Sequence, residues 1–187
     1  DKEILEMQHR GISLQKNDQE EFNKISEKLG KLSTEFSNNV LDATNEWFLI
    51  LNKKSEVDGL PERVLELMAI SAHNHLKKDE EVDIKNGPWK LSLDIPTYTS
   101  FMTYATERNL REKLYKAFVS RASQGEKNNS QIIEDILSLR TKQANLLGYK
   151  SWAELSLSTK MAKKIKNVEN LLELSLIHIS EPTRQVP

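Results

Sequence analysis

The residues best suited to bind a metal ion are the four histidines, His9, His73, His75 and His178. Zinc hydrolases often carry H-E-x-x-H on a helix, because a spacing of four residues puts both imidazoles on one face, beside the glutamate. None of the four histidines is followed by that glutamate, and no two of them are four residues apart. We therefore predict that no residue of this chain is a metal ligand.

The closest pair of histidines, His73 and His75, does not change this expectation. Two residues apart on a helix, their side chains would point about 200° away from each other. They could share a metal ion only if the helix unwound at that point. We interpret both as surface or helix-end residues.

Motifs for nucleophilic catalysis and for phosphate binding are also missing. The sequence has no Cys, no G-x-S-x-G motif, and no S-x-x-K accompanied by its partner motifs. Neither G-x-G-x-x-G nor G-x-x-x-x-G-K occurs. We interpret the acidic pairs Glu20–Glu21 and Glu80–Glu81 as solvated faces. The sequence thus predicts no catalytic residue and no cofactor-binding residue.

Positive charge gathers at one place, in the lysines Lys160, Lys163, Lys164 and Lys166. Such a cluster could meet an anion or nucleic acid, but no aromatic residue lies between the lysines to stack on a base. The whole chain has a net charge of -1. We therefore interpret the cluster as a solvated face or helix end, and expect neither nucleic acid nor a membrane as partner.

The elements that would position any site are mainly helices. The segment Asp18–Trp47 repeats apolar residues at spacings of three and four, which predicts one long amphipathic helix. Its apolar stripe consists of Phe22, Ile25, Leu29, Leu32, Phe36, Val40, Ala43 and Trp47. Further helices are predicted after Pro61, over Tyr98–Glu107 with Thr97 as cap, after a cap at Asn109, over Ile132–Leu147, and after a cap at Ser151.

A strand is predicted where apolar and polar residues alternate, over Trp89–Ile95. The apolar segment Trp47–Leu51 could be its partner. Few Gly and Pro residues occur in 187 residues, which also favours helices. The predicted fold class is all-α, a mainly helical array with one or two short strands near Trp47–Leu51 and Trp89–Ile95.

Five stretches of the sequence carry a family resemblance. They are Leu32–Thr44 (LSTEFSNNVLDAT), Gly59–Glu62 (GLPE), Gly87–Tyr98 (GPWK and LDIPTY), Leu110–Ser123 (LREKLYKAFVSRAS) and Leu139–Ala162 (LR, QANLLGY, AELSL and KMA). In their order and spacing, these stretches resemble the amino-terminal half of the thimet oligopeptidase and oligopeptidase A family of zinc metallopeptidases.

The resemblance implies a helical, bilobed fold with a deep channel in which short peptides are cleaved. In the family, zinc is held by the two histidines of H-E-x-x-H and by a later glutamate, all in the carboxy-terminal part. No position here matches them, so the resemblance implies zinc in the full-length protein and none bound by this chain. Residues 1–173 would form part of the amino-terminal lobe, supply channel wall and be inactive alone. The expected location is the cytoplasm.

The last residues do not fit this resemblance. Leu174–Arg184 reads LSLIHISEPTR, which resembles the translation of a sequencing adaptor. We therefore expect residues 174–187 to be a non-native tail, the alternative being a natural tail in which Pro182 stops a helix. The missing Met at Asp1 suggests that the true amino terminus lies upstream.

Two other functions remain open at this point. The chain could be a helical protein-interaction module, in which the stripe from Phe22 to Trp47 docks a partner helix. It could also bind nucleic acid weakly through the lysine cluster at Lys160–Lys166.

Overall fold

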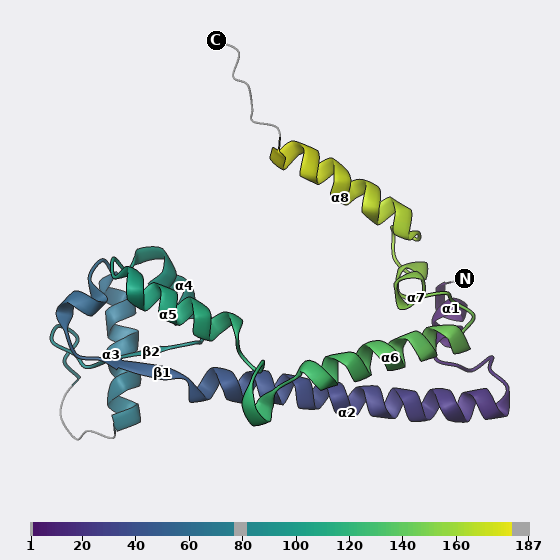
Figure 1. Ribbon diagram of the computed structural model, residues 1–187, viewed down its shortest axis with the longest axis horizontal. Coiled ribbons are helices and arrows are strands. Elements are labelled where there is room, and N and C mark those ends of the chain that lie inside the picture. Colours follow the sequence, from purple (N-terminus) through teal and green to yellow (C-terminus); the bar gives the residue numbers. More distant parts are fainter. Residues whose placement is uncertain (1, 77–81, 181–187) are drawn as a thin grey trace, which may run out of the picture. The chain divides into compact units, whose positions relative to one another are not determined.

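The structure is a computed structural model that describes residues 2–76 and 82–180, with the backbone alone for Lys2 and residues 176–180. The chain divides into two compact units, one of residues 1–33 and 132–187 and the other of residues 34–131. Its elements, in chain order (Figure 1), are α1 (Lys2–His9), α2 (Lys16–Glu46), β1 (Phe48–Leu51), η1 (Lys54–Val57), α3 (Glu62–Leu76), β2 (Trp89–Ser92), α4 (Ile95–Tyr104), α5 (Arg108–Val119), η2 (Gly125–Lys127), α6 (Ser130–Leu146), α7 (Trp152–Ser158) and α8 (Ile165–Ser180).

The predicted fold class is confirmed, because the chain is mainly helical with one small sheet. Strands β1 and β2 pair antiparallel, with Phe48 opposite Ser92 and Leu51 opposite Trp89. The apolar residues of the alternating pattern, Trp89 and Leu91, are the buried ones of β2 and are at most 1% exposed. The second strand ends earlier than predicted, and Ile95 begins α4 instead.

The long helix predicted from the apolar stripe is α2. All eight residues of the stripe are buried or half-buried, whereas most other positions of the helix are exposed. Phe22 and Ile25 are the most buried, at 6% exposure each. The period of the sequence pattern therefore reported the buried face of the helix correctly.

Two of the predicted helix caps are wrong. The cap of α4 is Asp94, whose carboxylate accepts a hydrogen bond from the Thr97 amide at 3.0 Å, so Thr97 lies inside the first turn. Pro96 is tolerated there because the first amides of a helix have no intrahelical acceptor. The cap of α5 is Glu107, and Asn109 is a helical residue whose amide donates to that carboxylate.

The predicted end of the helix at Glu107 is also wrong, because α4 ends at Tyr104, whereas the predicted cap at Ser151 is confirmed. The Ser151 hydroxyl accepts a hydrogen bond from the Glu154 amide at 3.2 Å and caps α7. Gly148 follows α6 with φ +83°, the left-handed conformation that glycine adopts without strain at a helix end.

Both units bury apolar side chains, and in the unit of residues 1–33 and 132–187 these include Phe22, Ile25, Leu139 and Leu155. In the unit of residues 34–131, the sheet packs with α3, α4 and α5 around Met68, Trp89, Leu91, Leu93, Phe101 and Leu114, all at most 1% exposed. In the other unit, the first half of α2 and α6 are joined by a hydrogen bond from Gln143 Nε2 to Ser26 Oγ of 2.9 Å. None of the helices in the described ranges combines the length and the apolarity needed to cross a bilayer.

Candidate functional site

His9 takes part in a small polar cluster of its unit. Its Nε2 lies 2.8 Å from Tyr149 Oη and 3.3 Å from Ser158 Oγ. The Ser158 hydroxyl already donates its proton to the Leu155 carbonyl at 2.7 Å. Ser158 can therefore only accept from the imidazole, and a serine held in this way is not poised as a nucleophile.

His73 and His75 lie in the last turn of α3, in agreement with the interpretation as helix-end residues. The His75 ring packs edge-on against Phe48, with centroids 4.3 Å apart, and the Lys90 ammonium lies 4.9 Å from the centre of the same Phe48 ring. His178 belongs to α8, and its side chain is outside the described part.

Neither group of histidines fits a zinc ion. Across the residues that the structure describes, no three His, Asp or Glu side chains come together as a metal site.

The charged groups singled out in the sequence are solvated where they are described. Glu20 and Glu21 are exposed on α2, and Glu80 and Glu81 fall outside the described residues. All four lysines of the cluster at residues 160–166 are exposed. Lys160 donates a hydrogen bond to Ser156 Oγ at 2.8 Å.

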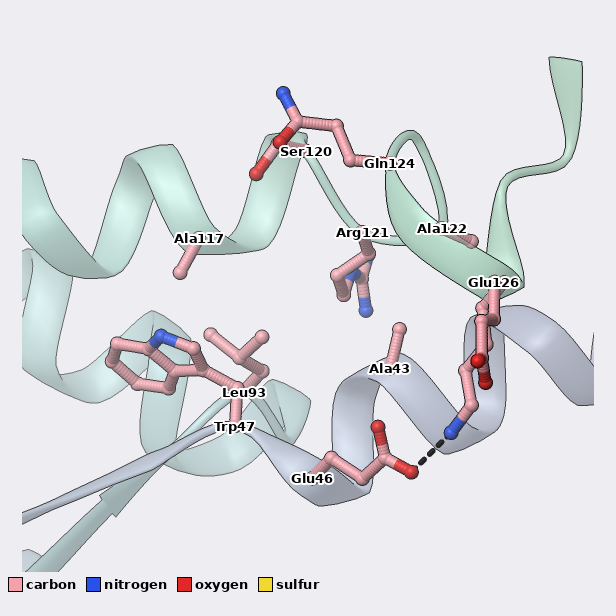
Figure 2. Close-up of a pocket in the computed structure, with 11 residues that line it drawn as sticks. Ala43, Glu46, Trp47, Leu93, Ala117, Ser120, Arg121, Ala122, Gln124 and Glu126 are labelled. Carbon is pink, nitrogen blue, oxygen red and sulfur yellow. Dashed lines mark hydrogen bonds and ion pairs between the residues drawn. The ribbon is translucent and has the colours of Figure 1, made fainter.

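A groove with a volume of about 640 Å³ lies on the surface of the unit of residues 34–131 (Figure 2). It is lined by the end of α2, by Leu93 after β2, by the end of α5 and by the loop that follows α5. The lining residues are Ala43, Glu46, Trp47, Leu93, Ala117, Ser120, Arg121, Ala122, Gln124, Glu126 and Lys127. We call this surface the α2–α5 groove.

Arg121 projects into the α2–α5 groove toward Ala43, between Ala117 on one side and Glu126 on the other (Figure 2). Its Nε donates to the Phe118 carbonyl at 2.8 Å, and its Nη1 donates to Thr44 Oγ1 at 3.1 Å. The guanidinium also lies 3.7 Å from the centre of the Phe118 ring. These contacts hold the side chain in one orientation, with its charge at the groove.

The second cation of the groove is already paired. Lys127 forms ion pairs with Glu46 (dashed in Figure 2) and, at 3.7 Å, with Asp42. The hydrogen bond to Glu46 and the nearby negative charges raise the pKa of Lys127 above its usual value. Arg121 is therefore the cation of the groove that is better placed to bind an anion.

Asn129 holds the loop that carries these residues. It is 2% exposed, its Oδ1 accepts from Asn39 Nδ2 at 2.8 Å, and its Nδ2 donates to the Phe36 carbonyl at 3.1 Å. The backbone N–H of Asn129 also donates to the carbonyl of Ala122, a residue at φ +50°. These bonds tie the loop to the second half of α2.

The groove has the character of a binding surface. The hydroxyl of Ser120, one of its lining residues, donates to the Lys116 carbonyl at 2.7 Å and so is not held as a nucleophile. The groove was not predicted from the sequence, because its lining residues come from three segments that are far apart along the chain. Part of it does fall within the stretch Leu110–Ser123 that carried the family resemblance.

Comparison with known proteins shows that the chain is similar to a family of peptidases. Residues 101–181 match the family described as Peptidase family M3. The chain is 44% identical over 171 residues to the probable cytosolic oligopeptidase A of Arabidopsis thaliana, covering 91% of the chain and 24% of that protein. It is 37% identical over 177 residues to oligopeptidase A of Escherichia coli K12, covering 92% of the chain and 25% of that protein.

The chain belongs to peptidase family M3, as a relative of the oligopeptidases A, and the resemblance seen in the sequence is confirmed. A third relative is the organellar oligopeptidase A, chloroplastic/mitochondrial, of Arabidopsis thaliana, with 46% identity over 164 residues, 88% of the chain and 20% of that protein. The chain spans about a quarter of the length of these curated relatives.

Proposed function

We propose that this chain is part of a zinc-dependent oligopeptidase that hydrolyses short peptides in a channel between two helical lobes. In this proposal, residues 1–173 are part of the amino-terminal lobe and supply channel wall. The observation that carries it is similarity to oligopeptidases A along about nine-tenths of the chain. The full-length protein would act in the cytoplasm, as the name of one plant relative suggests for that protein.

The sequence of this chain has no H-E-x-x-H motif, and in this proposal the chain alone does not perform the hydrolysis. The proposal assigns the metal to an H-E-x-x-H motif and a further glutamate in the remainder of the protein. There the ion would polarise the peptide carbonyl and activate water. The contribution of the present residues would be to shape the channel and to limit which peptides enter.

The alternative is a helical protein-interaction module, and one observation weighs against it. The stripe of α2 that would dock a partner helix is buried or half-buried along its length within the chain itself. A docking face would have to be exposed. Similarity to peptidases over most of the sequence favours the first proposal further.

Reading the encoding DNA past the codon for Glu173 tests the proposal most directly. We expect the reassembled reading frame to lose the LSLIHISEPTR stretch and to continue into a segment with H-E-x-x-H. A natural reading frame that keeps LSLIHISEPTR and stops soon after it would contradict both the proposed function and the non-native tail.

An activity assay gives a second test. The purified 187-residue chain, incubated with an internally quenched peptide and zinc, should show no hydrolysis above background. Hydrolysis that a chelator abolishes would mean that the chain holds a metal site of its own, against the proposal.

A further inference from the structure

Arg121 of the α2–α5 groove has more hydrogen-bond donors than it uses among the described residues. An arginine side chain has five N–H donors. Two of those of Arg121 have protein acceptors among the described residues, at Phe118 and Thr44. The other three belong to Nη1 and Nη2, the edge with which a guanidinium binds a carboxylate through two parallel hydrogen bonds.

Apolar surface lines the same groove. Trp47 and Ala117 are both lining residues (Figure 2), and both are half-buried, so part of the Trp47 indole remains available for contact. An apolar wall beside a fixed guanidinium suits a ligand that presents a carboxylate next to an aliphatic or aromatic side chain. The guanidinium is pre-ordered by its contact with Phe118, which in turn stacks on Tyr98 with centroids 3.9 Å apart. Little additional ordering is needed on binding.

From this geometry we infer that the α2–α5 groove is a docking site for an acidic side chain, Asp or Glu, flanked by apolar residues in another segment of the same polypeptide. The inference rests on the proposed function, in which the chain is part of a longer peptidase. About three quarters of the length of its relatives lies outside the aligned part. An internal segment carries its carboxylates on side chains, and its covalent linkage gives it a high effective concentration at the groove.

Three tripeptides test this chemistry on the 187-residue chain. The first is acetylated and amidated, with glutamate between two leucines. The second has glutamine in place of the glutamate. The third has glutamine and a free terminal carboxylate. The readout is the indole N–H signal of Trp47 in an NMR titration, assigned by its loss in Trp47→Phe, since the chain has three tryptophans.

We expect the glutamate peptide to bind about five-fold more tightly than the glutamine peptide, as for a charge-assisted pair at a partly exposed site. Arg121→Gln should remove this difference. Arg63→Gln is the matched control, since Arg63 is an exposed cation of α3 outside the groove, and the difference should persist there. If Arg121→Gln does not fold, as judged by circular dichroism, Arg121→Lys takes its place and should reduce the difference by about half because the fork is lost.

Three results would overturn the inference. The glutamate and glutamine peptides could bind equally, the difference could survive the change at Arg121, or the peptide with a terminal carboxylate could bind as tightly as the glutamate peptide. The last result would assign the groove to peptide ends instead of an internal segment. None of them bears on whether the full-length protein is a peptidase, which the DNA and activity tests address separately.

Discussion

Replacing Asn129 by alanine should destabilise the unit of residues 34–131 by about 2 kcal/mol. The asparagine is 2% exposed and makes two side-chain hydrogen bonds, one with Asn39 and one with the Phe36 carbonyl. A typical intramolecular hydrogen bond contributes about 1 kcal/mol net, and buried partners left without a bond add to the loss. Alanine keeps the backbone bond to Ala122 and removes both side-chain bonds.

Urea denaturation followed by circular dichroism measures this loss. With a slope of about 2 kcal/mol per molar urea, the transition midpoint should fall by about 1 M. The control is Asn109→Ala, because Asn109 is an exposed residue of α5 and alanine favours a helix, so its midpoint should not fall.

The two units could unfold separately, so the comparison uses the transition that Asn129→Ala moves. A midpoint that shifts by less than about 0.2 M at an unchanged slope would refute the reasoning. It would mean that Asn129 does not hold the loop to α2, and that the position of Arg121 in the groove has another cause.

Three other changes have definite expected outcomes. Leu114→Ala should cost about 3 kcal/mol in the same denaturation experiment, since Leu114 is fully buried and its loss leaves a cavity. Ser151→Ala should cost about 1 kcal/mol through the lost cap of α7, and Ser151→Thr should restore most of it. Burial raises the pKa of Asp94, but its hydrogen bonds outweigh burial and the pKa lies below the usual 3.8. The charged Asp94 therefore contributes to stability above about pH 4, and this contribution is lost as the pH falls toward the lowered pKa of the folded state. Asp94→Asn should flatten the acid side of a plot of the denaturation midpoint against pH.

Periodic patterns predicted the elements of this fold well, because they report burial directly. The stripe of α2 and the alternation of β2 are both consequences of one buried face. Caps were predicted less well, because several residues near a helix start can each act as a cap. Asp94 and Thr97 lie on either side of Pro96, and both residue types are good helix caps. The sequence alone does not show which of the two is the N-cap.

The α2–α5 groove could not be predicted in this way. Its walls come from residues 43–47, Leu93 and residues 117–127, and no local spacing links these segments. The stretch Leu110–Ser123 carries part of the family resemblance. Similarity of this kind does not show which of its side chains line a surface. The structure adds that Arg121, near the end of that stretch, is a half-buried cation with a fixed orientation.

The end of α2 explains why this loop and its cations belong together. Asp42 and Glu46 lie near the carboxyl end of the helix, where the dipole disfavours negative charge, and the last turn of α2 has no basic residue. The compensating cations come from the loop after α5. Lys127 pairs with both acids, and Arg121 donates to Thr44 in the same part of the helix.

In the inferred docking site, the charges at the end of α2 would also act on the incoming carboxylate. Removing Lys127 would leave Glu46 and Asp42 without their cation at a helix end, and their negative charge would then compete with an incoming carboxylate for Arg121. Lys127 also lines the groove. We expect Lys127→Gln to weaken binding of the glutamate peptide, and 0.5 M salt, which screens exposed charges over a few ångströms, to reduce that penalty. A Lys127→Gln variant that bound the glutamate and glutamine peptides in the same ratio as the unchanged chain, at low and high salt, would show that the acids of α2 do not influence the groove.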